Sequence, residues 1–558
     1  MSTKAKSTTL AVGTLTFVGM TCALVASIRN IPDIAATGWQ MFFFMLIATV
    51  LFALPVTLIA GEFAGMMPRN GGPELWVTTG IGERWGFVTS WLLWVQMFPG
   101  MVMVASVLAP MLGTTFNNDA LGLNNIFTLV CILVVYWIIS ILNLFFDMAK
   151  IGGQIGIWLG LYIPIVVMFA LGIGAIAVTG IKAESTLGTF AWGKLIPDFT
   201  DGATLQFFLA IIFIYTGIEM SSVYITRLRN AVKTYLKGIF IALIFVFLFN
   251  VVLAFLVANI VPEGKMELNN IAQAVVLFLE VLGWPTWIAN VFAALVFIGV
   301  AVQLSAWASG PAKTITNSAR RGLYPPKLGY WKSNKYGVSR NVILTQATII
   351  SLFTLLYVVV PGVNDAFLVL VTATSILYII VYVLMAIAII RLRKTQAATA
   401  RPFRIGGGKS NTLLWIVVVV LLLTIAVGSY FTFVSNSFWN LVLLIGITVV
   451  LGFGIPLWIF AARKAAWKTT VDAALAAHPE SAADAASEAD AGDSAPAPVP
   501  APAAAAASAD AGSKVPVSVG APGADAGDAA ASGTEAAPAP APASPPASGG
   551  DSNGPTSG

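Results

Sequence analysis

The chain has 558 residues, of which 58% are hydrophobic and 10% are charged, with a formal net charge of +5. A soluble protein carries roughly 25% charged residues, so this composition excludes a water-soluble globular fold. Apolar runs of about 18 residues or more recur along the chain, and each is long enough to cross a bilayer as a helix. Because these runs are too long and too continuous for barrel strands, the sequence predicts an all-α membrane protein.

Twelve membrane spans are predicted, within one membrane domain over residues 1–461. In chain order they cover residues 10–29, 38–60, 86–112, 124–146, 153–180, 203–224, 237–261, 284–308, 340–360, 364–390, 411–433 and 438–461. The first run continues into Arg29-Asn30-Ile31-Pro32 without a small-residue cleavage site. We therefore interpret it as a span and not as a signal peptide.

Two stretches near span ends carry residues that break helices. Residues 61–87, between spans 2 and 3, combine glycine, tryptophan and charges such as Glu62, and they predict an interfacial loop. At the end of span 8, Gly310-Pro311 is expected to stop the helix.

Lysine and arginine are sorted unevenly between the loops. If the N-terminus lies inside, most of the 30 Lys and Arg residues fall in loops on its side of the membrane. The opposite side holds Lys182, Lys194 and Lys265, with Arg29 near the end of span 1. This bias predicts two cytoplasmic termini in the plasma membrane and an even number of spans. The positive charge is then a topology signal, and we expect no nucleic-acid partner.

Residues 462–558 have a different composition. Ala, Pro, Ser, Gly and Asp dominate, and no aromatic residue follows Trp467. Such a segment buries too little apolar area to offset its ordering entropy, so a disordered cytoplasmic tail is predicted. From Thr469 onward, acidic residues outnumber Lys514, the one lysine. The tail could dock on the basic cytoplasmic face or stay solvated, and both interpretations remain open.

The residues that carry most enzyme chemistry are scarce. The two cysteines, Cys22 and Cys131, lie in apolar runs, and the one histidine, His478, lies outside them. They form neither a disulfide framework nor a metal-binding spacing. The glycine-rich run at 405–409 lacks the spacing and the context of a phosphate-binding loop. We therefore expect no enzyme, no metal and no cofactor.

Glycines interrupt the first and the sixth spans in corresponding places. Gly19 lies within Phe17–Ala23, and Gly217 lies within Tyr215–Glu219. Interrupted helices at matching positions in two halves indicate a transport site, because unwinding frees backbone N–H and C=O groups near the midplane. Half-helix N-termini can hold a carboxylate and freed carbonyls an ammonium, which suits an α-amino acid. The candidate binding residues here are Gly19, Met20, Thr21, Cys22, Ala23, Thr216 and Gly217. The alternative is that both are packing glycines.

Glu219 is the only acidic residue that the pattern places well within the hydrocarbon depth. An ionisable group at that depth is costly and is by default a functional-site candidate. Three interpretations are open. Glu219 could carry a coupling proton, pair with a substrate amine, or act as a structural carboxylate satisfied by Ser, Thr or backbone partners.

Span 10 carries two tyrosines on one helical face. Tyr378 and Tyr382 are four residues apart, so their side chains are neighbours on a helix. Each offers a ring and a hydroxyl that could hold a substrate or close a gate. A simple aromatic packing stripe would give the same spacing.

At these residues the chain resembles the amino acid–polyamine–organocation superfamily. Within it, the chain is most similar to the glutamate:γ-aminobutyrate antiporter family of bacterial acid resistance. The resemblance covers residues ~10–461. The matching stretches are Ile31-Pro32…Ala36-Thr37-Gly38, Gly71-Gly72…Trp76-Val77, Arg84-Trp85-Gly86-Phe87, Tyr215-Thr216-Gly217-Ile218-Glu219, Ala306-Trp307…Gly310-Pro311, Tyr378…Tyr382 and Phe403…Gly407-Gly408-Lys409.

The resemblance implies a LeuT-like fold and the exchange of an amino acid for its decarboxylation product. Two inverted repeats of five spans would cover residues 10–180 and 203–390, with two additional helices at 411–461. Residues that match the family's binding site are Glu219, Tyr378 and Tyr382, with a broken backbone at Met20–Ala23. The chain departs from the family at Arg29, where a tyrosine is usual, and at Gln303, where a glutamate is usual.

Two alternatives to exchange remain. One is a proton-coupled permease for the uptake of amino acids or polyamines. The other, from a different class, is a membrane receptor or scaffold whose tail recruits partners. All three embed the chain in a bilayer, and the two transport hypotheses require a small-molecule substrate. The sequence leaves the oligomeric state open.

Overall fold

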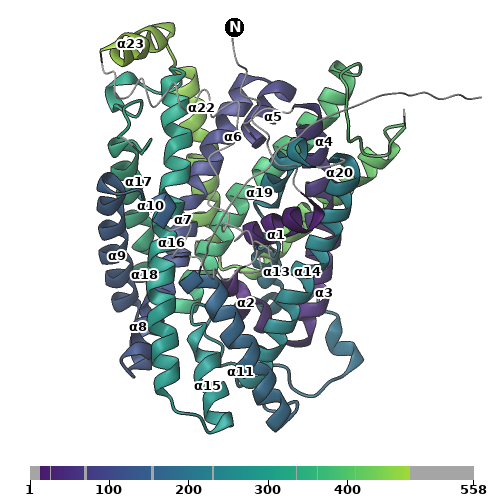
Figure 1. The fold of residues 1–558 in the computed structure, drawn as a ribbon, viewed down its shortest axis with the longest axis vertical. Helices are drawn as coiled ribbons and strands as arrows, with labels where there is room; N and C mark the ends of the chain where they lie inside the picture. The colour runs from purple at the N-terminus through teal and green to yellow at the C-terminus, as the bar shows by residue number, and fades with distance from the viewer. Residues whose placement is uncertain are drawn as a thin grey trace, which may run out of the picture. The chain divides into compact units, whose positions relative to one another are not determined.

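The computed structural model describes residues 13–25, 27–67, 72–151, 156, 158–228, 231–334, 336–360, 362–408 and 410–477. Within these ranges the chain is helical, apart from loops and one isolated antiparallel bridge between Ser185 and Pro262 (Figure 1). The principal helices are α1 (Thr14–Val25), α2 (Ile31–Ala35), α3 (Met41–Ile47), α4 (Leu54–Met66), α5 (Gly72–Ile81), α6 (Glu83–Val95), α7 (Met97–Ser106), α8 (Leu108–Thr115), α9 (Asn125–Phe145), α10 (Met148–Ile151), α11 (Ile163–Thr179), α12 (Gly202–Leu205), α13 (Phe207–Phe213), α14 (Ala231–Ile260), α15 (Ala272–Leu282), α16 (Trp287–Arg320), α17 (Arg340–Thr354), α18 (Leu356–Val359), α19 (Val363–Thr395), α20 (Thr412–Ser435), α21 (Phe438–Gly446), α22 (Ile455–Ala461) and α23 (Ala465–Ala476).

Ten continuous helical segments in the described chain are long and apolar enough to cross a membrane. They are Gly38–Met66, Glu83–Thr115, Asn125–Phe145, Trp158–Thr179, Val232–Ile260, Trp287–Arg320, Arg340–Val359, Val363–Thr395, Thr412–Ser435 and Phe438–Ala461. Each corresponds to one of the twelve predicted spans. The two predicted spans without such a helix are the first and the sixth, which the structure breaks into short pieces.

The first segment breaks at a different place from the predicted one. Gly19 lies inside α1, and the chain leaves the α-helix only after Val25. A 3-10 turn at Ile28–Asn30 follows, with Ser27 as its N-cap, and α2 then begins at Ile31. The prediction of unwound backbone at Met20–Ala23 is therefore wrong. A glycine is tolerated within a membrane helix, whereas Pro32 favours a new helix start because its ring fixes φ and it lacks an N–H.

The sixth segment breaks at the predicted glycine. α13 ends at Phe213, a turn follows, and a 3-10 helix runs from Ile218 to Arg227. Gly217 has a φ of +89°, a left-handed conformation that only glycine adopts without cost. α13 packs against α19, and the 3-10 helix packs against α1 and α4 (Figure 1).

The outer surface of α9 is apolar along one stripe. Ile126, Val130, Val134, Ile138 and Ile141 are all about half exposed and follow each other at helical spacing. An exposed apolar face of this length is rare on the helices of water-soluble proteins and is typical of contact with lipid. With ten membrane-length helices in the described residues, the protein is a multi-pass membrane protein.

Two glycines, Gly160 in the segment before α11 and Gly299 in α16, let the backbones of these two segments touch where they cross. A Cβ atom added to Gly299 would lie 2.2 Å from the backbone nitrogen of Gly160. Gly156 also lies close to the backbone of Gln303, where an added Cβ would be 3.0 Å from its nitrogen. Small residues permit such close approach between membrane helices, so Gln303 is held on a tightly packed wall.

Two boundary predictions are corrected by the structure. Glu62 and residues 72–81 belong to helices α4 and α5, not to an interfacial loop. α16 continues through Pro311 to Arg320, because neighbouring groups in a membrane protein can satisfy the carbonyl that a proline frees. Residues 68–71 lie outside the described residues.

The first part of the predicted disordered tail is helical. Residues 465–476 form α23, an alanine-rich helix whose Val471 is fully buried. α23 packs against α16 and the turn that follows it, and a Cβ added to Gly322 would lie 2.9 Å from the Cα of Lys468. Alanine has the highest helix propensity, and packing supplies the rest. Residues 478–558 lie outside the described residues.

Candidate functional site

A cavity of about 110 Å³ lies between the two interrupted segments. The first segment contributes Val25, Ser27, Arg29 and Asn30, and the sixth contributes Phe213, Ile214 and Thr216. Gln303 and Trp307 of α16 line it as well, together with Gln96, Leu161 and residues of α7 and α19. The volume suits a small solute, since pockets for drug-sized ligands are roughly 300–1,000 Å³.

Arg29 is the only charged side chain among the residues that line this cavity. Only 8% of its surface is exposed. Its Nε donates to the Ser27 hydroxyl at 3.1 Å, and its guanidinium carbon lies 4.5 Å from the centre of the Trp307 ring. Its Nη1 has no hydrogen-bond partner. The cavity therefore carries a positive charge with an unused donor.

Glu219 lies beside the cavity but does not line it. Its carboxylate is fully buried and accepts two hydrogen bonds, from the Tyr378 hydroxyl at 2.9 Å and from the Tyr382 hydroxyl at 2.7 Å. The Tyr382 oxygen in turn accepts the backbone N–H of Gly217 at 3.0 Å. Both carboxylate oxygens are thus occupied by α19, and the network fastens the Gly217 turn to that helix.

The structure divides the predicted site residues into three groups. Thr216 and Gln303 line the cavity. Gly217, Glu219, Tyr378 and Tyr382 form the hydrogen-bonded cluster just described. The third group lies in α1, away from the cavity lining, and comprises Gly19, Met20, Thr21 and Cys22.

Within α1, Thr21 is satisfied locally, because its hydroxyl donates to the carbonyl of Phe17 at 3.0 Å. Cys22 is buried. The side chain of Ala23 lies outside the described residues. Thr21 and Cys22 are therefore buried in the packing of α1, whereas Met20 is half-buried and Gly19 is exposed.

The sequence did not single out Ser27, Asn30, Gln96 or Trp307 as lining residues. Arg29 stood out only as a departure from a family pattern and as a charge near a span end. Burying a charge in a membrane is costly, and this argument singled out Glu219 as a candidate site residue. The same argument would have singled out Arg29. Asp33 and Glu62 are also buried carboxylates, so Glu219 is not the only acidic residue in the interior.

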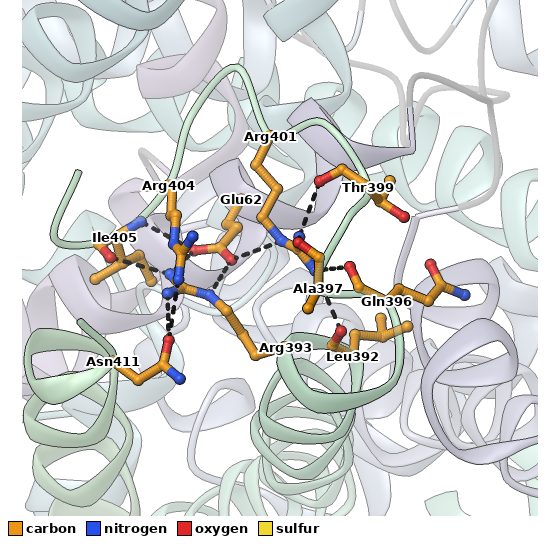
Figure 2. A network of polar contacts seen from close by, with 10 residues as sticks. All are labelled: Glu62, Leu392, Arg393, Gln396, Ala397, Thr399, Arg401, Arg404, Ile405 and Asn411. Carbon is orange, nitrogen blue, oxygen red and sulfur yellow. Dashed lines mark hydrogen bonds and ion pairs between the residues drawn. The ribbon is translucent and has the colours of Figure 1, made fainter. Parts of the chain in front are cut away.

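A second polar network joins α4 to the end of α19. Figure 2 shows Glu62 facing Arg393, whose Nε and Nη2 each donate to one carboxylate oxygen at 2.5 Å. Glu62 also accepts the backbone N–H of Ile405 at 2.9 Å and lies 3.3 Å from Arg401. A bidentate pair of this kind is geometrically specific, so it fixes the loop after α19 onto α4.

The whole membrane domain matches one known family. Residues 12–467 match the family described as amino acid permease. The chain belongs to the amino acid permease family. The resemblance to the amino acid–polyamine–organocation superfamily is thereby confirmed, and the family and its relatives are transporters and not enzymes.

Relatives of this permease are identical to it at about a quarter of the aligned positions. It is 28% identical to an uncharacterized transporter of Legionella pneumophila, over 69% of this chain and 81% of that protein. It is 27% identical to a glutamate/gamma-aminobutyrate antiporter of Lactococcus lactis, over 70% and 78% of the two chains. A probable agmatine/putrescine antiporter of the same species is 25% identical, over 72% and 83%.

Proposed function

We propose that this permease is a secondary active transporter that exchanges an amino acid, such as glutamate, for its decarboxylated amine product, such as γ-aminobutyrate. The observation that carries the proposal is the cavity bounded by both interrupted segments. Such breaks leave backbone N–H and C=O groups free to bind the charged ends of an amino acid. Two relatives, the glutamate/gamma-aminobutyrate antiporter and the probable agmatine/putrescine antiporter, support exchange over one-way uptake.

The proposal includes a fuller architecture. The two interrupted segments complete a set of twelve spans, arranged as two inverted repeats of five with two additional helices. Both termini lie in the cytoplasm and the protein resides in the plasma membrane. Alternating access then exposes the cavity to each side in turn, as one group of helices rocks against the other.

Counterflow in proteoliposomes tests the proposal. Vesicles that contain the purified full chain are loaded with γ-aminobutyrate or left empty, and uptake of labelled glutamate is measured without ATP. We expect uptake only into the loaded vesicles. Uptake into empty vesicles that requires only a proton gradient would replace exchange by proton-coupled uptake. Failure to move any of a broad panel of amino acids and amines would overturn transport itself.

A further inference from the structure

The charge of the cavity bears on which substrates it accepts. Arg29 is its one charged lining residue, and the remaining polar lining side chains, such as Ser27, Gln96 and Gln303, are neutral. No carboxylate lines the cavity among the described residues. Any solute inside it therefore meets an uncompensated positive charge in a largely apolar surrounding, where electrostatic interactions are stronger than in water.

Nearby carboxylates do not neutralise Arg29. Glu219 accepts hydrogen bonds from two tyrosines. Asp33 is buried in α2, and its Oδ1 has no hydrogen-bond partner. Neither carboxylate has an oxygen within 4.0 Å of a guanidinium nitrogen of Arg29, so neither forms an ion pair with it. The described residues provide no other acidic partner for Arg29. A buried guanidinium without a counter-charge is costly, and an anionic ligand would remove that cost.

The guanidinium is also oriented for a ligand. Trp307 lies against its face, and Ser27 accepts from Nε. Nη1 is left without a partner. A planar guanidinium that is held by its face and by one edge can offer its remaining N–H groups to a carboxylate. Stacking on tryptophan further limits the loss of side-chain freedom when the ligand binds.

We infer that Arg29 is a specificity-determining residue of this cavity, and that it selects substrates with a carboxylate over amines that have none. This inference rests on the proposed function and narrows it. The two kinds of antiporter among the relatives differ in this respect, because glutamate and γ-aminobutyrate carry a carboxylate, whereas agmatine and putrescine do not. An amine without a carboxylate would bring a second positive charge to Arg29 and leave Nη1 unpaired.

The test uses γ-aminobutyrate and putrescine, which both contain four carbons and one common ammonium end, and which differ at the other end, where γ-aminobutyrate has a carboxylate and putrescine an aminomethyl group. Each competes with labelled glutamate for exchange by the full chain in proteoliposomes. We expect γ-aminobutyrate to compete at least about tenfold better than putrescine, since a charge-assisted hydrogen bond is worth roughly that factor or more. Equal competition by putrescine would overturn the inference and leave the proposed function standing. The absence of exchange with every probe would overturn both.

Substitution of Arg29 tests whether this residue is the source of the preference for substrates with a carboxylate. R29Q is expected to raise the KM for glutamate roughly 10- to 100-fold, and R29K to recover part of that loss because it restores the charge without the planar fork. The matched control is R391Q, which removes an arginine from an exposed position on α19. An unchanged KM in R29Q would overturn the inference. If R29Q does not fold, the competition between γ-aminobutyrate and putrescine in the wild-type chain still decides.

Discussion

Arg29 and Glu219 are two buried charges that the protein treats in opposite ways. Both oxygens of Glu219 receive a tyrosine hydroxyl, whereas Arg29 keeps an unpartnered nitrogen beside the cavity. A satisfied charge stabilises the fold around it, and an unsatisfied one favours a ligand. The geometry therefore assigns Glu219 chiefly to the support of the Gly217 turn, and it leaves proton coupling open to experiment.

E219Q tests this support at the residue scale. We expect the substitution to weaken the link between the turn and α19 and to destabilise the protein by about 1–3 kcal/mol, the cost typical of hydrogen bonds to a charged group. The readout is the melting temperature, followed with a thiol-reactive dye. Both cysteines are buried and become reactive on unfolding.

The order of substrate preference is expected to stay the same in E219Q. Loss of amine binding would instead indicate that Glu219 pairs with the substrate. Retained binding with a flat pH profile of transport would assign it the coupling proton. E280Q, at an exposed carboxylate on α15, is the matched control and should behave like the wild type.

At the scale of single elements, the two interruptions have different origins. Gly217 is visible in the sequence because its positive φ requires a glycine. The break after Val25 has no such signature, and Gly19 misleads because a glycine in a membrane helix need not break it. Sequence reasoning thus located one break and missed the other, and it placed the candidate binding residues of span 1 too early.

Two glycine substitutions separate these cases. G217A forces an alanine into a left-handed conformation and is expected to cost about 1–2 kcal/mol. G19A adds a methyl group in open space, with no atom within 4 Å of its Cβ, and is expected to be neutral or slightly stabilising. Melting temperatures of both variants make the comparison. Equal destabilisation would place a strained break at Gly19 as well.

The buried ion pair between Glu62 of α4 and Arg393 of α19, which we call the clamp, could not be predicted from the sequence. Glu62 and Arg393 are 331 positions apart, and each stands near the end of an apolar run, where a charge is normally assigned to the membrane surface. Most of the ten unbroken spans were predictable to within a few residues because their apolar runs are continuous, as at 438–461. α16 is the clearest exception, since it continues well beyond the predicted end at residue 308. Tertiary partners and the paths of broken segments depend on packing that local patterns do not encode.

E62Q tests the clamp. Removal of one partner from a buried ion pair leaves Arg393 without its counter-charge and typically costs about 3–5 kcal/mol. The double variant E62M/R393M is expected to be less destabilised, since it removes both charges. The control is E83Q, because Glu83 and Arg463 form an exposed pair whose loss costs roughly 0–1 kcal/mol. A melting temperature of E62Q equal to that of E83Q would contradict the role of the clamp.

At the scale of the whole molecule, the orientation in the membrane follows from loop charges. The loop between α19 and α20 carries several arginines, including Arg401 and Arg404, and the long loop after α11 carries few positive charges. The charge bias predicts that the first of these loops lies in the cytoplasm and the second outside. In this predicted orientation, the network of Figure 2 would lie on the cytoplasmic side.

Single cysteines test the orientation. Ala183 and Ala398 are exposed, and the two native cysteines are buried, so the background labelling is expected to be low. In intact cells, an impermeant maleimide should label A183C. It should label A398C only after the cells are permeabilised. The reverse pattern would invert the topology, and labelling of both positions from outside would mean that the number of spans between them is even and not odd as predicted.

The backbone contact between Gly160 and Gly299 gives the cavity one stiff side. Two segments whose backbones touch without intervening side chains cannot slide past each other without a clash, so we expect Gln303 and Trp307 to move little relative to the segment before α11. The opposite side of the cavity is built from the interrupted segment that carries Arg29, and the stacking of Arg29 on Trp307 joins the two sides. If transport moves the interrupted segment against α16, the distance between these two side chains should change with it and report the extent of that movement.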